Sequence, residues 1–146
     1  MPTSAERDDV DAIVQLTVDY CWAIDEQNFD GLRRIFTSDA EAQMVGTDRR
    51  GIDEIIDFVR GVLTPLDASQ HMLTNHAVVV DGDRATGRCY FHAQHIRRAA
   101  EGGRNLVIGG RYDDEFVRTV DGWRISRRTA AAMWREGNPA VIDRSA

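Results

Sequence analysis

The chain has 146 residues, of which 42% are hydrophobic and 29% charged, and its formal net charge is −6. This size and composition predict one globular domain, residues 1–146, with a substantial core. The net negative charge argues against a nucleic-acid partner, because the sequence has no stripe of basic residues that could neutralise phosphates. No apolar run approaches the roughly 18 residues of a membrane span, and the polar N-terminus differs from a secretory signal. We therefore expect a cytoplasmic protein with no membrane partner.

The first part of the chain has helical periodicity. Apolar residues from Val10 to Trp22 recur at three- and four-residue spacing, which predicts a helix that Ser4 or Asp8 caps and that ends near Ile24. Residues 1–8 are expected to form an irregular leader. A second, short helix over residues 29–36, a short strand over residues 40–45 and a third helix ended by Pro65 follow.

After residue 68 the period of the apolar residues changes to two. Residues 71–80, 84–97, 105–120 and 123–134 predict four strands joined by glycine-containing turns, and residues 136–146 an irregular tail. We expect an α+β fold in which three N-terminal helices pack on one face of a curved, mainly antiparallel sheet. Such an arrangement leaves a conical cavity suited to a small molecule.

Asp25 lies at the end of the first helix among apolar neighbours. Its position alone favours a cap for the following helix. If the carboxylate is buried instead, it needs a partner, and His71 at the start of the first long strand is the one we expect. A carboxylate fixes one tautomer of an imidazole, which can then act as a general base. The alternative is a histidine with a purely structural hydrogen bond.

The spacing of the histidines argues against a metal site. His71 and His76 are five residues apart and should point to opposite faces of a strand, while Asn75 shares the face of His71. His92 and His95 should also face opposite ways. No HExxH or CxxC pattern is present, so no metal is expected.

A covalent nucleophile is not expected either. The chain has no GxSxG, and Cys21 lies in an apolar helix where nothing would lower its pKa. The two cysteines, Cys21 and Cys89, are typical of small buried residues in a reducing compartment. An Asp–His pair without a nucleophile indicates proton abstraction rather than acyl transfer.

Three more side chains can serve a substrate. Arg127 and Arg128 alternate on a strand, so one of them faces inward, where an arginine would bind an anion or a developing negative charge. The alternative is that both pair with surface acids. Tyr20 and Tyr112 can each offer a hydroxyl to a substrate oxygen, or can simply be core residues with a satisfied hydroxyl.

Taken together, these features resemble the SnoaL-like branch of the nuclear-transport-factor-two-like superfamily over residues 11–134. The motifs that carry the resemblance are Asp25, Phe29-Asp30-x-Leu32, Gln70-His71 and Asp121-Gly122-Trp123-Arg124-Ile125. The pattern is most similar to scytalone dehydratase and hexachlorocyclohexane dehydrochlorinase. In those enzymes a helix aspartate pairs with a strand histidine that abstracts the proton in an elimination.

The resemblance implies a cone-shaped α+β barrel and places individual residues. Asp25 and His71 match the dyad, Arg128 matches a cavity arginine of the dehydrochlorinase, and Thr74-Asn75 matches a Thr-Asn pair after its histidine. The cavity lysine of the dehydrochlorinase is replaced by Tyr20, and its cavity tryptophan by about Ala42. A second cavity histidine of scytalone dehydratase falls near His95.

The resemblance therefore implies a lyase or dehydratase without a cofactor, acting on a small hydrophobic molecule that is polyketide-like or aromatic. His71 and Asp25 would be catalytic. Expected contacts to the substrate or an oxyanion are Arg128, Tyr20, Tyr112, Asn75 and His95, and the expected pocket lining is Trp22, Phe58, Val62, Phe91 and Ala130. The alternatives are an isomerase or polyketide cyclase with the same base, or a ligand-binding module without chemistry. An epoxide hydrolase fits less well, because its Asp-Arg-Asp arrangement has no place here.

A homo-oligomer, a trimer or a dimer, is also expected. We assign five apolar residues to the outer face of the sheet, which is more than a small monomer needs there: Val78, Val80, Phe116, Trp123 and Trp134.

Overall fold

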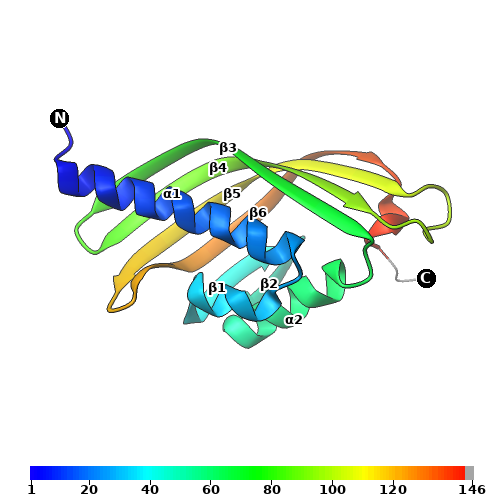
Figure 1. Cartoon of the computed structure of the whole chain (residues 1–146), viewed down its shortest axis with the longest axis horizontal. Coiled ribbons are helices and arrows are strands. Elements are labelled where there is room, and N and C mark those ends of the chain that lie inside the picture. The colour runs from blue at the N-terminus through cyan, green and yellow to red at the C-terminus, as the bar shows by residue number, and fades with distance from the viewer. Residues whose placement is uncertain (144–146) are drawn as a thin grey trace.

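The computed structural model describes residues 1–143 and is built on one six-stranded sheet of order β2-β1-β6-β5-β4-β3 (Figure 1). The strands are β1 (Phe36–Met44), β2 (Thr47–Arg50), β3 (Ala68–Asp81), β4 (Arg84–Ile96), β5 (Asn105–Thr119) and β6 (Gly122–Gly137). The helices are α1 (Ser4–Asp25) and α2 (Ile52–Leu63), with 3-10 turns η1 (Phe29–Arg34) and η2 (Pro139–Val141). Strand β1 runs parallel to β6, and every other neighbouring pair is antiparallel.

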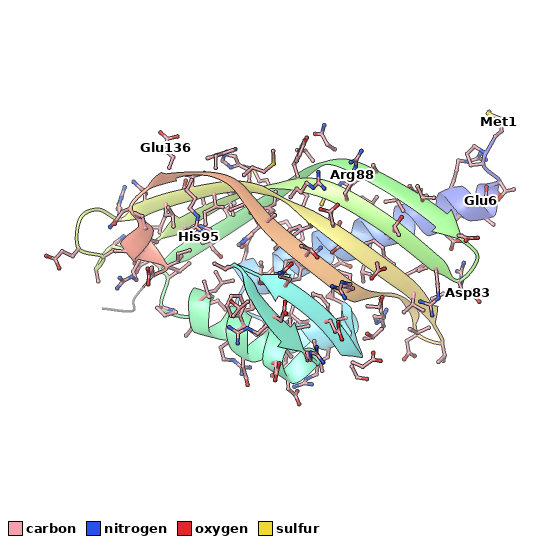
Figure 2. All side chains as sticks on the ribbon, turned by 180° about the vertical axis from the view of Figure 1, so that it is seen from behind. Met1, Glu6, Asp83, Arg88, His95 and Glu136 are labelled. Atoms are coloured by element: carbon pink, nitrogen blue, oxygen red, sulfur yellow. The ribbon has the colours of Figure 1, made fainter. Side chains whose placement is uncertain are left out.

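The expected α+β class is confirmed, with helices packed against one face of a curved sheet. Helix α1 lies across the long strands, and Figure 2, from behind, shows it on the far side of the sheet. Because β2 and β3 are the two edges, the sheet stays open and does not close into a barrel. Strand β2, which the sequence did not predict, forms one edge of the sheet.

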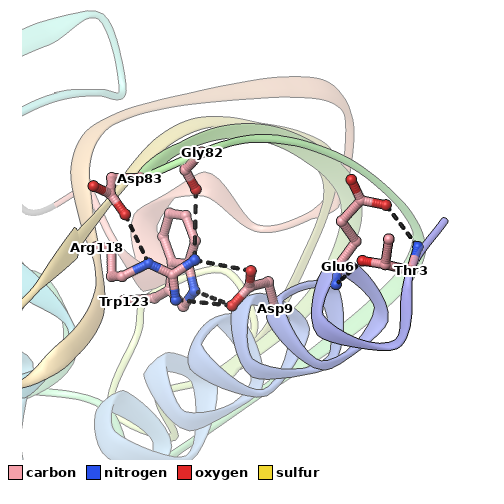
Figure 3. Close-up of polar contacts among 7 residues, drawn as sticks. All are labelled: Thr3, Glu6, Asp9, Gly82, Asp83, Arg118 and Trp123. Carbon is pink, nitrogen blue, oxygen red and sulfur yellow. Dashed lines mark hydrogen bonds and ion pairs between the residues drawn. The ribbon is translucent and has the colours of Figure 1, made fainter.

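Helix α1 begins at Ser4, so the expected irregular leader over residues 1–8 is wrong. Thr3 Oγ1 accepts a hydrogen bond from the backbone N–H of Glu6 at 3.1 Å, and Glu6 Oε2 accepts one from the N–H of Thr3 at 2.8 Å (Figure 3). This reciprocal capping box satisfies two N–H groups that the first turn of a helix leaves free.

The N-terminal half of α1 is fixed to the sheet by Arg118. Its guanidinium donates to both carboxylate oxygens of Asp9 at 2.9 Å and to Asp83 Oδ1 at 3.0 Å (Figure 3). Asp9 also accepts from Nε1 of Trp123 at 3.1 Å, and the guanidinium lies 4.6 Å from the centre of the Trp123 ring. One aspartate of α1 thus joins the helix to both long hairpins.

The outer-face assignment of four apolar residues is wrong. Phe116 and Trp123 are buried, and Val78 and Val80 pack against the core. They belong to the inward set of the alternating strand residues, which α1 covers. Of the five residues, Trp134 is the exposed one, at 44%.

The expected irregular tail is also wrong where the structure describes it. Strand β6 runs to Gly137, and η2 then buries Val141 completely. Arg97 holds this turn, because its guanidinium donates to the carbonyls of Ala140 at 2.9 Å and Val141 at 3.3 Å. Residues 144–146 of the tail lie outside the described residues. Among residues 1–143, no helix is long and apolar enough to cross a membrane.

Candidate active site

A cavity opens between the concave face of the sheet, the C-terminal half of α1 and α2. It encloses about 760 Å³ with its open mouth included. Its wall is formed by Tyr20, Ile24, Met44, Val45, Phe58, Val59, Val62, Leu63, His71, Phe91, Ala93, His95, Ile108, Tyr112, Ala130, Ala132, Arg135 and Ile142. The lining is therefore mostly apolar, with two phenols, two imidazoles and one guanidinium.

Four of the five residues expected to line the pocket do so: Phe58, Val62, Phe91 and Ala130. The fifth, Trp22, is 64% exposed, so that expectation is wrong. On α1 the inward residues are Tyr20 and Ile24, one turn apart. A residue two positions from each of them points about 200° away and therefore faces solvent.

Asp25, the last residue of α1, and His71 on β3 are in direct contact. Asp25 Oδ1 lies 2.7 Å from His71 Nδ1, and Oδ2 accepts the backbone N–H of His71 at 2.8 Å. Ser69 Oγ donates to Oδ1 at 2.9 Å. With Nδ1–H donated to the carboxylate, Nε2 of His71 is the nitrogen left for a ligand in the cavity.

The alternative role of Asp25 as a cap is filled by another residue. The Asn28 side chain caps η1 by accepting the backbone N–H of Gly31 at 3.3 Å. The three hydrogen bonds of Asp25 all come from β3 instead. The carboxylate thus links the end of α1 to the start of β3.

His95, on the neighbouring strand β4, lies beside His71 in the wall. The two rings are 5.6 Å apart between centroids and meet edge to face at 84°. Burial, and next the charge of His71, lower the pKa of His95 to about 4. His95 is therefore neutral near pH 7. Its Nδ1 lies 3.3 Å from the carbonyl oxygen of Leu106, so Nδ1 carries the proton and Nε2 is an acceptor.

Tyr20 and Tyr112 form another part of the wall, with ring centroids 6.0 Å apart. Burial raises the pKa of Tyr20 to about 12 and raises that of Tyr112 well above its ordinary value. Both phenols are therefore neutral and can donate a hydrogen bond. Phe91 stacks on Tyr112 at 4.6 Å and holds its ring in place.

Arg128 does not line the cavity, so the expectation that it contacts a substrate is wrong. Its side chain is fully buried, and Nε and Nη2 donate to the two carboxylate oxygens of Asp114 at 2.8 and 2.9 Å. The guanidinium lies 4.4 Å from the Tyr20 ring centre and 3.9 Å from that of Tyr112. It therefore supports the two phenols from behind. The alternative of a surface partner is also wrong for Arg128, since Asp114 is buried, whereas Arg127 does pair with an exposed acid, Glu41.

A bulge in β3 changes the expected positions of Asn75 and His76. Asn75 has φ +59°, and the register of β3 against β4 shifts between Thr74 and Ala77. Asn75 is exposed and does not line the cavity, so its expected substrate contact is wrong. The extra residue turns His76 inward, where Nε2 lies 2.9 Å from Thr17 Oγ1. His71 and His76 thus face the same way, contrary to the expectation, but His76 is outside the cavity wall.

Sequence reasoning missed Arg135, an exposed residue of the cavity wall. The last strand was expected to end at Trp134, one residue before Arg135. In addition, the register of β5 against β6 shifts between Gly109 and Gly110, so strict alternation along β6 does not predict which way Arg135 points. Within residues 1–143, no group of three or more His, Cys, Asp or Glu side chains is placed to hold a metal ion.

Solved structures share this fold. A candidate aromatic ring hydroxylase from Novosphingobium aromaticivorans is 30% identical, with a TM-score of 0.82 over 93% of this chain and 97% of that one. A candidate scytalone dehydratase from the same organism is 22% identical, with a TM-score of 0.78 over 87% and 85%. A hexachlorocyclohexane dehydrochlorinase is 22% identical, with a TM-score of 0.77 over 90% and 88%. The last two likenesses establish a common fold.

An uncharacterized protein of Mycobacterium tuberculosis is 42% identical over 139 residues, which cover 93% of each chain. The family model of the SnoaL-like domain matches residues 5–129. It therefore includes nearly all of α1, the dyad, strands β1 to β5 and the first half of β6. This match extends over most of the chain, and the chain belongs to the SnoaL-like domain family.

Proposed function

We propose that the protein is a lyase that needs no cofactor and eliminates a leaving group from a small hydrophobic molecule. The observation that carries the proposal is the Asp25–His71 contact of 2.7 Å at the wall of an apolar cavity. The carboxylate orients the ring and stabilises the imidazolium that forms when Nε2 takes a proton. His71 would be the general base and Asp25 its positioning partner.

In the proposed reaction, Nε2 of His71 removes a proton from a carbon next to an electron-withdrawing group. The C–H electron pair becomes the new double bond, and the leaving group departs from the adjacent carbon with its own bonding pair. The Tyr20 and Tyr112 hydroxyls would donate to the developing oxyanion or leaving group. The neutral His95 would accept a hydrogen bond from a substrate hydroxyl through Nε2. Imidazolium then returns its proton to the leaving group or to water.

The relatives support this class of chemistry. Two proteins of the same fold are named for eliminations, a scytalone dehydratase and a hexachlorocyclohexane dehydrochlorinase. The apolar lining, with Phe58 and Phe91 in the wall, suits a polyketide-like or aromatic body. The same base could instead drive isomerisation or cyclisation. The neutral Tyr20 and Tyr112 hydroxyls favour dehydration, because a departing hydroxide needs a hydrogen-bond donor.

The test uses cyclic β-hydroxy ketones, whose dehydration produces an enone that absorbs in the ultraviolet. The wild type should form enone, and His71→Gln should form it at least a hundredfold more slowly. Deuterium uptake in heavy water without loss of hydroxyl would indicate an isomerase. Full turnover in the His71→Gln variant would rule out His71 as the general base. If the wild type shows no turnover and the variant binds the ligand with unaltered affinity, the protein is a binding module.

We further propose a homo-oligomer that works in a reducing cytoplasm. The side of the sheet away from α1 exposes Met72, Val79, Tyr90 and Trp134, which a second copy could cover. Cys21 and Cys89 are free and buried, as suits a reducing compartment. A monomeric mass by light scattering would contradict the assembly.

A further inference from the structure

We infer that Arg135 selects anionic ligands, so that the natural substrate has an apolar body and a carboxylate or similar anion at the cavity mouth. The inference rests on the proposed use of this cavity as a substrate site. It adds the charge of the substrate, which neither the dyad nor the apolar lining defines.

The direction of Arg135 follows from the pairing of β6 with β5. Arg135 is the register partner of Ile108, whose side chain lines the cavity. The preceding residue, Trp134, packs instead over Gly109 and contacts His92 at 5.5 Å between ring centroids, on the outer face. Since successive strand residues alternate, Arg135 points to the cavity side. It is also exposed, which places it at the mouth.

Arg135 is the one permanently charged side chain in a wall that contains no carboxylate. The other polar groups of the wall are the two phenols and the imidazoles of His71 and His95. Across residues 1–143, no hydrogen bond or ion pair engages the Arg135 guanidinium. Seven other arginines form ion pairs with acids: Arg33, Arg60, Arg98, Arg111, Arg118, Arg127 and Arg128. Its five N–H donors are therefore available to a planar anion.

A second arginine near the mouth has a different task. The guanidinium of Arg97 donates to the carbonyls of Ala140 and Val141 and so holds η2 against the sheet. The next residue, Ile142, completes the cavity wall close to the end of β6. The N–H donors of Arg97 are thus used to hold η2 at the mouth of the cavity, whereas the N–H donors of Arg135 are free to bind a ligand. An anion there would orient the apolar body inward, toward the wall that holds His71 and His95.

The experiment compares two probes of nearly equal shape, naphthalene-2-carboxylate and naphthalene-2-carboxamide. Both are titrated by calorimetry into the wild type, Arg135→Gln and Arg88→Gln. Arg88 is a matched control because it is an exposed arginine on β4 that does not line the cavity. It precedes the buried Cys89 and therefore points to the opposite face of the sheet. Neither probe can undergo elimination, so the result is independent of whether the dyad is catalytic.

The wild type should bind the carboxylate roughly five- to tenfold more tightly than the carboxamide, as expected for one partly exposed charge-assisted contact. Arg135→Gln should abolish that preference and leave carboxamide affinity unchanged, and Arg88→Gln should keep it. Raising the salt concentration should weaken carboxylate binding alone. Equal affinities in the wild type, failure of the carboxylate to bind, or a preference that survives Arg135→Gln would overturn the inference.

Discussion

His71 donates to Asp25 twice, through its backbone N–H at 2.8 Å and through Nδ1 at 2.7 Å. One carboxylate therefore fixes both the start of β3 and the orientation of the ring. Ser69 adds a third donor, so the charge at the end of α1 is compensated although Asp25 is only 17% exposed. The dyad is thus part of the contact that joins helix to sheet, and its geometry does not depend on a flexible loop.

Asp25→Asn should lower kcat for an elimination by roughly 10²- to 10⁴-fold while the protein stays folded. The amide has nearly the same shape, but it cannot stabilise an imidazolium and it can present NH₂ to Nδ1, which favours the wrong tautomer. Steady-state kinetics, with circular dichroism as a check of folding, measures this. His76→Gln is the matched control, because His76 shares the strand and the inward direction but bonds to Thr17. Equal losses in both variants would show a general effect of disturbing β3.

His95, the buried histidine beside His71, predicts that the stability of the protein depends on pH. Folded protein keeps His95 uncharged down to about pH 4, because burial and the charge of His71 lower its pKa. In the unfolded chain the imidazole takes up a proton near pH 6.5, so the unfolded state binds more protons between these values. Stability should therefore fall by about 2 kcal/mol between pH 7 and pH 5 from this residue alone.

Urea unfolding of the wild type and His95→Gln at pH 7, 6 and 5 measures this contribution. The variant should show a smaller loss of unfolding free energy over this range, since glutamine does not titrate. His76, whose pKa is also lowered by burial, is present in both proteins and cancels in the comparison. If the unfolding free energies of the two proteins change equally with pH, then His95 is not held neutral by the fold.

Much of the fold and the dyad were predictable from the sequence. The change from helical to alternating periodicity near residue 68 separates helices from strands, and the pattern around Asp25 and His71 carried the family resemblance. The capping box was also visible, because Thr3 and Glu6 have the spacing that defines it. The irregular leader was therefore an avoidable error.

The errors in the direction and partners of strand residues have a common physical cause, which is strand register. Strict alternation assigns His71 and His76 to opposite faces, but one extra residue at Asn75 reverses every later side chain of β3. The partner of Arg128 likewise depends on the pairing of β5 with β6, which places Asp114 opposite it. Because period-two patterns carry no marker for an inserted residue, these contacts need the structure.

Asn75→Val should destabilise the protein by roughly 1–2 kcal/mol. Asn75 has φ +59°, a region that asparagine tolerates and that β-branched residues avoid. Asn75→Gly should stay within about 0.5 kcal/mol of the wild type, since glycine adopts positive φ freely. Thr74→Val, at the preceding exposed position, is the control for added apolar surface. Equal stabilities of the valine and glycine variants in urea would contradict the strained bulge.

The Asp114–Arg128 pair should behave as a unit whose halves are costly to separate. Both side chains are almost fully buried and joined by two hydrogen bonds of 2.8 and 2.9 Å. Asp114→Leu or Arg128→Met alone should reduce the unfolding free energy by roughly 3–5 kcal/mol, because each leaves one charge buried without its partner.

The double variant, Asp114→Leu with Arg128→Met, should be more stable than either single variant, since no unpaired charge remains. Urea denaturation of the four proteins gives the coupling energy directly. The double variant also removes the guanidinium from behind Tyr20 and Tyr112, so probe binding in the cavity should weaken even where stability recovers. Additive losses of stability would mean that the two residues contribute separately, and unchanged probe affinity would mean that the phenols hold their positions without Arg128.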